Sequence, residues 1–243
     1  MFDFKTNVIR FNKLSRLYLP LLQYLIMTGF SLFHLQQTPY QEALDFQKFW
    51  FDQQLEKKAK QESTVNTLIL LQHTPVYTLG KSGDINNLKI PIEETDAEYF
   101  QTSRGGDITY HGPGQITGYP VFDLDSFNIG VRKYVELLEE CIIDCIAIYG
   151  LKGERIDDAS GVWIDANGDK PRKICAVGIK VSRMITMHGF AFNVNTDLGY
   201  FENIVPCGLN DKGVTSLSKE LGKEMNLFEV EENLVKCFQK RFA

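Results

Sequence analysis

The segment GVWIDANGDKPRKICAVGIKVSRMITMHGFAFNV, residues 161–194, predicts three consecutive β-strands. Asn167-Gly168 is a strong turn signal between the first strand and the second, although this connection is longer than two residues. The second strand is predicted from Lys173 to Val181 and the third from Thr186 to Val194. Because both connections are short, we expect an antiparallel meander.

Helical patterns lie on both sides of this meander. Apolar residues recur with helical spacing near 40–60, 131–149 and 227–242. Thr38-Pro39-Tyr40-Gln41 looks like a capping box with Pro at the first helical position. TLILLQH, residues 67–73, is typical of a buried strand. Helices at the ends with strands between them predict an α+β fold whose mixed or antiparallel sheet is flanked by helices.

The composition of the 243-residue chain is that of a globular protein. With 44% hydrophobic and 23% charged residues, the chain can bury a sizeable core. A net charge of -5 argues against nucleic-acid binding through bulk charge. Five cysteines without a CxxC pair and four histidines without ligand spacing argue against a zinc site. We therefore expect no metal, no cofactor, no nucleic-acid partner and a reducing, cytoplasmic location.

The N-terminus differs from the rest of the chain. Residues 1–30 are basic and then apolar, but the apolar run over 17–35 is interrupted and short for a membrane span. Two interpretations fit: a membrane anchor, or a mis-assigned start with Met27 as the first translated residue. We expect one domain over 31–243, a separate extension before it, and no stable membrane association.

A glycine-rich stretch, RGGDITYHGPGQITGYP, spans residues 104–120 and holds five glycines and two prolines. Glycine loses more backbone freedom on folding than any other residue, so this density has a cost. It fits a long irregular turn, and it equally fits a backbone whose amides must approach a ligand closely. In the second interpretation, Arg104 and His111 fix the loop or the ligand.

Cys207 stands out among the cysteines. Pro206 and Gly208 fix the backbone on each side and leave its thiol outside any regular element, as a nucleophilic cysteine requires. The common alternative for a free cysteine is a small buried hydrophobe. That alternative is our interpretation of Cys141, Cys145 and Cys237.

Lys173 is the second candidate for chemistry. Strand alternation puts it on the same face as Cys175, Val177 and Ile179, and a lysine on an apolar face suits proton transfer. The alternative is a strand-end lysine that extends to water. His111 and His188 are each followed by glycine, which suggests that they share one site.

Three segments resemble the signature blocks of the lipoyl(octanoyl) transferase family. These are RGGDITYHGPGQITGYPVFDL at 104–124, KICAVGIKVSRMITMHGFAFNV at 173–194 and PCGLNDKGVTSL at 206–217. TPYQEALDFQ and LLQHTPVYTLGK resemble the family's opening helix and strand. The resemblance covers about 38–221 and does not include 1–30.

The resemblance implies the fold of the biotin and lipoate protein ligase catalytic domains. It implies an enzyme of protein lipoylation that moves an octanoyl group from octanoyl-acyl carrier protein to a lysine of lipoyl domains or of the glycine cleavage H protein. Cys207 matches the residue that carries the acyl thioester, and Lys173 matches the lysine that lowers the pKa of its thiol. Cys175 replaces a more usual Ala and adds a thiol near the site. The residues that match acyl-substrate contacts are Arg104, Gly105, Gly106, Asp107, Ile108, Thr109, Tyr110, His111, Ala176, Val177, Gly178, Gly189, Phe190 and Ala191.

Three alternatives stay open at this point. An ATP-dependent lipoate-protein ligase would share the fold but would need no nucleophilic cysteine. A thiol hydrolase would use Cys207 with water as the acceptor, and a binding module would hold acyl-loaded carriers without chemistry. Carrier proteins and lipoyl domains are generally acidic, so we expect them to dock on a local basic face. The candidates for this face are Lys170, Arg172, Lys180, Arg183 and Lys212.

Overall fold

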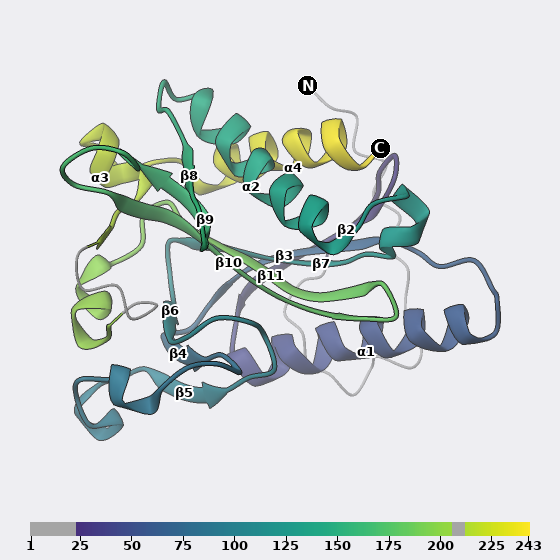
Figure 1. Ribbon diagram of the computed structural model, residues 1–243, viewed down its shortest axis with the longest axis horizontal. Helices are drawn as coiled ribbons and strands as arrows, with labels where there is room; N and C mark the ends of the chain where they lie inside the picture. The colour runs from purple at the N-terminus through teal and green to yellow at the C-terminus, as the bar shows by residue number, and fades with distance from the viewer. Residues whose placement is uncertain (1–22, 206–211) are drawn as a thin grey trace.

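The computed structural model describes residues 23–205 and 212–243, which are built around one large β-sheet (Figure 1). Its strands lie in the order β1-β2-β3-β7-β11-β10-β9-β8, and the short β12 pairs with β10. The strand bounds are β1 (Gln23–Ile26), β2 (Ser31–Thr38), β3 (Thr67–His73), β7 (Gln115–Val121), β8 (Glu154–Ile156), β9 (Ala159–Ile164), β10 (Arg172–Ser182), β11 (Ile185–Asn193) and β12 (Gly213–Val214).

The meander predicted for residues 161–194 is confirmed and forms one half of this sheet. β10 pairs antiparallel with both β9 and β11, and β11 pairs antiparallel with β7. β2 runs parallel to β3 because α1 (Tyr40–Ala59) carries the chain back between them. The sheet is therefore mixed, as the α+β prediction allows.

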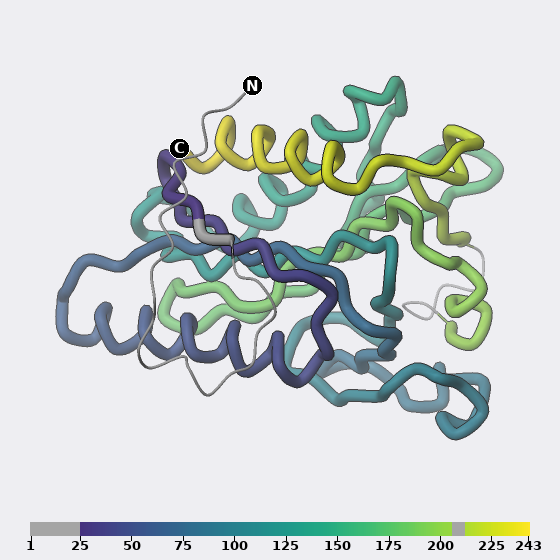
Figure 2. The backbone as a smooth tube through the Cα atoms, turned by 180° about the vertical axis from the view of Figure 1, so that it is seen from behind, coloured from purple at the N-terminus to yellow at the C-terminus, as the bar shows by residue number. Residues whose placement is uncertain are grey.

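Helices cover both faces of the sheet. α1 lies against one face, and α2 (Val131–Ala147) and α4 (Leu227–Phe242) lie against the other (Figure 1), as the reverse view in Figure 2 also shows. The larger apolar core fills the space between the sheet and the α2–α4 pair, where Phe238 is fully buried. A second core lies under α1 and includes Phe46. The short α3 (Leu217–Leu221) precedes α4.

α1 begins at Tyr40, one residue after the predicted first helical position at Pro39, and the predicted capping box is wrong. Pro39 is the N-cap and makes no side-chain capping hydrogen bond. The Thr38 hydroxyl instead donates to the Gln36 carbonyl at 2.8 Å. Thr38 is the last residue of β2, so its extended backbone turns the side chain to a local partner. The helix begins here because Pro39 has a φ of -53° and no amide that would need a partner.

A second, three-stranded sheet has the order β5-β4-β6 and a small core of its own. Its strands are β4 (Val76–Leu79), β5 (Glu98–Gln101) and β6 (Thr109–His111). The connecting 3-10 turns of the chain are η1 (Ile85–Asn87), η2 (Ile92–Glu94), η3 (Leu124–Phe127) and η4 (Leu198–Asn203). The glycine-rich stretch begins after β5, forms β6 and ends in β7. It therefore joins the small sheet to the central sheet.

The described chain begins at the edge of the central sheet. β1 pairs antiparallel with β2, and Phe30 between them is part of the larger core. Residues 1–22 lie outside the described residues, so the domain boundary expected near residue 30 stays a prediction. Within the described ranges, the chain has no helix with the length and apolar character needed to cross a bilayer.

An ion pair joins this edge of the sheet to the C-terminal helix. His34 on β2 and Glu231 on α4 are 2.9 Å apart, and both are at most partly exposed. The hydrogen bond to Glu231 raises the pKa of His34 above 6.5, although burial acts in the opposite direction. A raised pKa means that the pair stabilises the fold fully below pH 6.5 and less as the pH rises through the folded-state pKa.

We predict that His34→Gln lowers the free energy of unfolding by about 1 kcal/mol at pH 6 and by less at pH 8. Urea denaturation of both proteins at the two pH values measures the difference. His73, His111 and His188 have lowered pKa values, so they do not titrate between these pH values. An equal loss at pH 6 and pH 8 would show that His34 contributes packing and not charge.

Candidate active site

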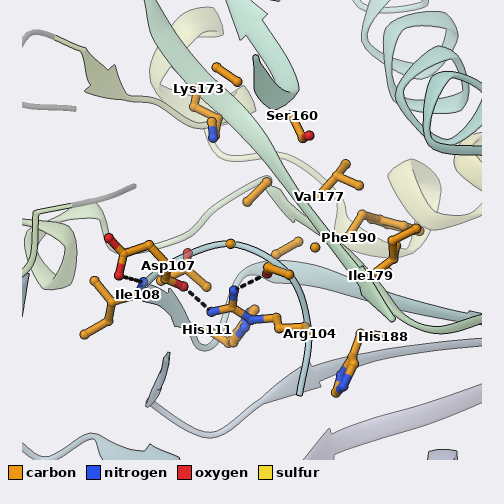
Figure 3. Close-up of a pocket in the computed structure, with 18 of the residues that line it drawn as sticks. Arg104, Asp107, Ile108, His111, Ser160, Lys173, Val177, Ile179, His188 and Phe190 are labelled. Atoms are coloured by element: carbon orange, nitrogen blue, oxygen red, sulfur yellow. Dashed lines mark hydrogen bonds between the residues drawn. The ribbon is translucent and has the colours of Figure 1, made fainter. Parts of the chain in front are cut away.

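A cavity of about 510 Å³ lies where the glycine-rich stretch meets β10 and β11 (Figure 3). Lys173 lines it together with every residue predicted to contact the acyl substrate except Tyr110. His111 and His188 both line it, so their predicted placement in one site is confirmed. Their contact with an acyl chain stays a prediction.

Tyr110 faces away from this cavity into the small sheet. Its ring stacks on Tyr200 with centroids 4.3 Å apart and planes 6° apart. Its hydroxyl lies 2.0 Å from the point that a Cβ of residue 112 would occupy, so Gly112 is required there. Tyr110 therefore shapes the glycine-rich stretch from behind.

Arg104 holds that stretch in place from inside the fold. Its Nη2 donates to the Thr78 carbonyl at 2.5 Å, to the Thr78 hydroxyl at 3.0 Å and to the Asp107 carbonyl at 2.7 Å. Its Nη1 donates to the Gly105 carbonyl at 3.0 Å. The guanidinium is buried, and Figure 3 shows it inside the curve of its own loop. These bonds make Arg104 a loop anchor, which is one of the two roles predicted for it, and its contact with a substrate stays a prediction.

The loop also rests directly on β10. The Gly105 amide donates to the Ile179 carbonyl at 2.9 Å. A Cβ on Gly178 would lie 3.0 Å from the Gly105 carbonyl oxygen and 3.3 Å from the Arg104 side chain. Gly178 thus permits a close approach that most other residues would push apart. The next residue of the loop, Gly106, has a φ of +86°, which favours glycine.

His111 continues the chain of hydrogen bonds that starts at Arg104. The neutral His111 ring carries its proton on Nδ1, because that nitrogen faces the Gln115 side-chain oxygen, so His111 Nε2 accepts from the Thr78 hydroxyl, 3.2 Å away. His111 Nδ1 then donates to the Gln115 side-chain oxygen at 2.8 Å. Gln115 is oriented by donating to the Tyr110 carbonyl and to Asn193. Both ring nitrogens of His111 are therefore bound within the protein, which leaves neither available as a general base.

The buried histidines around Arg104 are neutral near pH 7. Burial lowers the pKa of His73 to about 4 and that of His188 to about 3, and the charge of Arg104 adds to the shift at His188. Burial, followed by His73 and Arg104, holds the pKa of His111 well below its usual value. These imidazoles line or support the cavity wall without adding charge.

Lys173 lies at the other end of the cavity from Arg104 (Figure 3). It pairs across the strands with Trp163, and its Nζ lies 4.6 Å from the centroid of that ring. The face of an indole attracts an ammonium group, so Trp163 holds the lysine side chain against β9. The Thr215 amide donates to the Lys173 carbonyl at 2.9 Å, which fixes its backbone from the other side.

Strand alternation does not extend from Lys173 to Cys175 as predicted. A register shift between these residues in the β9–β10 pairing turns Cys175 into the larger core, where it is fully buried. Burial raises the pKa of its thiol well above the usual range. The described lining of the cavity does not include Cys175, so it does not add a thiol to the site.

The other described cysteines belong to the core, as predicted. Cys141, Cys145 and Cys237 are buried between α2 and α4. Burial raises the pKa of Cys141, and contact with Cys237 together with burial raises that of Cys145. The raised values keep the Cys141 and Cys145 thiols protonated and unreactive near neutral pH.

Cys207 lies outside the described residues, but the chain on both sides of it is well defined. Before it, the Val205 amide donates to the Asn87 carbonyl at 2.8 Å. After it, the Gly213 amide donates to the Pro171 carbonyl at 2.9 Å, and β12 pairs with β10 beside Lys173. Phe201 and Val214, one on each side, both line the cavity.

Asp107 joins the glycine-rich loop to the segment that holds Val205. One carboxylate oxygen accepts from the Ile108 amide at 2.7 Å and from the Asp84 amide at 3.2 Å. The other accepts from the Asn87 side chain at 2.5 Å. No sequence motif singled out Asn87, Thr78 or Trp163, although the strand register would have placed Trp163 opposite Lys173.

The predicted basic face is partly neutralised. Arg172 donates to both carboxylate oxygens of Glu220 at 2.6 Å, and Asp165 lies 3.8 Å from its Nη1. Lys180 lies 5.6 Å from the centre of the Phe51 ring. The use of this face for docking stays a prediction. Arg172 is its least suitable residue, because its charge is already paired with Glu220. The described residues contain no group of three His, Cys, Asp or Glu side chains that could hold a metal.

Comparison with known proteins identifies relatives along most of the chain. The family model of the lipoyl protein ligase A/B catalytic domain matches residues 39–239. An octanoyltransferase of Parabacteroides distasonis is 48% identical over 89% of this chain and 100% of its own length. An octanoyltransferase of Porphyromonas gingivalis is 53% identical over 84% of this chain, and the match spans 42% of that protein.

Solved structures share the fold at low sequence identity. A lipoate-protein ligase A bound with ATP has a TM-score of 0.63 at 16% identity and covers 86% of this chain and 84% of its own. A bipartite lipoate protein ligase of Thermoplasma acidophilum, studied with its E2 lipoyl domain, has a TM-score of 0.63 at 14% identity over 86% of this chain and 82% of its own. These likenesses confirm the predicted ligase-type catalytic-domain fold.

We predict that Arg104→Lys lowers the free energy of unfolding by about 3 kcal/mol, because one ammonium cannot reproduce the planar fork that binds three carbonyl oxygens. Guanidinium denaturation measures the loss. Arg132→Lys is the matched control, since the Arg132 side chain is 96% exposed, and we expect almost no change. Equal stability of the two variants would show that Arg104 does not anchor the loop.

Proposed function

The chain belongs to the lipoyl protein ligase A/B catalytic-domain family and is an acyltransferase, and we propose that it transfers octanoyl groups from octanoyl-acyl carrier protein to lysines of lipoyl domains. The curated relatives are named octanoyltransferases. The donor, the acceptor and the route through a Cys207 thioester are inferred from the residues that match the family's blocks. The expected cytoplasmic location stays a prediction.

The observation that carries this proposal is the shape and chemistry of the cavity wall. Val177, Ile179 and Phe190 from β10 and β11 give it an apolar side, which suits a medium acyl chain (Figure 3). Lys173 supplies an amine at one end. Phe201 and Val214, which lie on the two sides of Cys207 in the sequence, line the same cavity and support the proposal that Cys207 and Lys173 act at one apolar slot.

In the first half-reaction, Cys207 Sγ attacks the carbonyl carbon of the octanoyl thioester as a thiolate. Lys173 takes the thiol proton or stabilises the thiolate by its charge. The bond between the acyl carbon and the carrier sulfur breaks, and the carrier leaves as a thiol after taking up one proton. The octanoyl group is then bound to Cys207 as a new thioester.

In the second half-reaction, the amine of the incoming lysine attacks this thioester. A C–N bond forms, the bond between the acyl carbon and Cys207 breaks, and the amine loses one proton. Lys173 passes a proton from the amine to the cysteine sulfur, which restores the starting enzyme. Neither His111 nor His188 is needed for this route, in agreement with their neutral rings and with the internal hydrogen bonds of His111.

Acyl carrier proteins and lipoyl domains are the proposed partners, with the glycine cleavage H protein as a further acceptor. The Thermoplasma acidophilum ligase is described together with its E2 lipoyl domain as an archaeal lipoylation system. Without Arg172, which pairs with Glu220, the candidate docking charges are Lys170, Lys180, Arg183 and Lys212. Reversal of two of these charges should slow association with the carrier.

The ATP-dependent ligase is the second candidate, since ligases of that kind share the fold. Cys207 favours the transferase, because a ligase that activates a free acid with ATP does not need a nucleophilic thiol. Assays of octanoyl transfer with and without ATP separate the two. If octanoyl transfer stops when ATP is left out, the protein is an ATP-dependent ligase and not a transferase.

We predict that Cys207→Ala abolishes both the octanoyl adduct and transfer, because the attacking sulfur is absent. Lys173→Ala should form the adduct about 30-fold more slowly at pH 7, because only about 3% of a free thiol with a pKa of about 8.5 is ionised there, and the rate should recover as the pH rises above 8.5. Intact-protein mass spectrometry after mixing with octanoyl-acyl carrier protein measures the adduct, and a lipoyl domain then tests transfer.

Cys175→Ala is the matched control for these variants, and we expect almost unchanged rates because Cys175 is buried away from the cavity. Peptide mapping of the adduct identifies the acylated residue. Full transfer by Cys207→Ala, or an octanoyl group on Cys175 or Lys173, would overturn the thioester assignment. Release of octanoate in place of the amide would favour the hydrolase.

A further inference from the structure

The charged side chains of the cavity wall suggest how the acceptor lysine is received. Within the described residues, four charged side chains line the cavity: Arg104, Asp107, Asp158 and Lys173. Two are cations and two are carboxylates. The hydrogen bonds of Arg104 to its own loop leave Lys173 as the cation at the chemical end of the cavity.

The two carboxylates differ in their hydrogen-bond partners. Asp107 accepts from two backbone amides and from the Asn87 side chain, so it is part of the loop. Asp158 makes no hydrogen bond or ion pair with another residue in the ranges 23–205 and 212–243, and it is exposed. Asp158 is therefore the carboxylate of the wall that is able to meet a ligand.

The position of Asp158 is fixed although its side chain is exposed. It lies in the two-residue turn between β8 and β9, where Ile156 pairs with Ala159, and its φ is +60°. The Trp163 indole nitrogen donates to the carbonyl of Ala159, the residue that directly follows this turn, at 3.0 Å. The acid is thus held on a short hairpin at the rim of the cavity.

The same hairpin lies beside Lys173. Trp163, which donates to the residue after the turn, is the ring under the Lys173 ammonium. A Cβ on Gly161 would lie 3.4 Å from Cδ of Lys173, so the strand that follows the turn contacts the stem of the lysine. Figure 3 shows Ser160, which follows the turn, and Lys173 on the side of the cavity away from Arg104. Asp158 therefore belongs to the part of the site where the second half-reaction takes place.

We propose that Asp158 binds the ammonium group of the acceptor lysine and guides it to the acyl-enzyme. This inference rests on the proposed function, because it assumes a lysine acceptor. The acceptor lysine arrives as an ammonium, which the carboxylate at the rim attracts, and it loses one proton to solvent before its amine attacks. The acyl donor brings a neutral thioester to the same cavity and gains nothing from Asp158. The acid therefore acts on the second half-reaction and not on the first.

The proposal is tested with Asp158→Asn in the full chain. Asparagine tolerates the left-handed backbone of this turn as well as aspartate does, so the hairpin is preserved. Asp157→Asn is the matched control, because Asp157 is the exposed neighbour in the same turn and does not line the cavity. Adduct formation with octanoyl-acyl carrier protein and transfer to a lipoyl domain are measured separately by quenched-flow mass spectrometry.

We expect Asp158→Asn to form the adduct at the rate of the unchanged enzyme. Its second-order rate constant for transfer to the lipoyl domain should fall about fivefold at low ionic strength, with the difference shrinking at high salt. Hydroxylamine, which is uncharged at neutral pH, should remove the octanoyl group from both enzymes equally fast. Asp157→Asn should match the unchanged enzyme in every assay.

Several outcomes would overturn the proposal. Equal transfer to lysine by Asp158→Asn and the unchanged enzyme would show that the acid does not bind the acceptor. Slower adduct formation would show that Asp158 serves Lys173 instead, and an equal loss with hydroxylamine would show a defect in the shape of the site. If the unchanged enzyme forms no adduct at all, the proposed function fails before this inference is reached.

Discussion

The fit of the Arg104 guanidinium among backbone carbonyls is the interaction on which the rest of the site depends. Its donors reach Thr78 on β4 as well as Gly105 and Asp107 in its own loop, so one side chain joins the small sheet to the glycine-rich stretch. A lysine would bring one nitrogen where the guanidinium brings a planar fork. The backbone can therefore be rich in glycine and still have one conformation. The glycines allow the close approach to β10, and Arg104 removes the freedom that they would otherwise leave.

This anchor also determines which side chains in the cavity carry charge. The buried cation and the low polarity around it lower the pKa values of the neighbouring histidines, so these rings act as neutral hydrogen-bonding walls. The side chains proposed to act on the thiol and on the acceptor lysine lie instead at the far end, where Lys173 rests on Trp163 and Asp158 stands at the rim. In the proposed mechanism, the half of the cavity that is fixed by Arg104 holds the acyl group, and the half with Lys173 and Asp158 acts on protons and on the amine.

The sequence predicted these parts unevenly, and the reasons are physical. The meander and the long helices follow from period and turn signals, because burial imposes those patterns on every residue of an element. The lining of the cavity followed from family blocks. Tyr110, in the middle of one such block, faces the opposite way because β6 alternates between the cavity and the small core. The place of Cys175 depended on a register shift, and that of Thr38 on a local hydrogen bond, neither of which has a sequence signal.

The region of the small sheet supports the segment that leads to the proposed nucleophile. Asp107 accepts from Asn87, and the Asn87 carbonyl accepts from Val205, which is two residues before Cys207. η4 is held at the same place, because the Tyr77 hydroxyl donates to the Tyr200 carbonyl at 2.8 Å. Beyond Cys207, the chain returns to β10 next to Lys173. The chain before Cys207 is therefore bonded to the region of the small sheet and the chain after it to the central sheet, and the glycine-rich stretch joins these two sheets. In the proposed mechanism both half-reactions use this cavity, so a loosened loop should impair both of them even when Lys173 is unchanged.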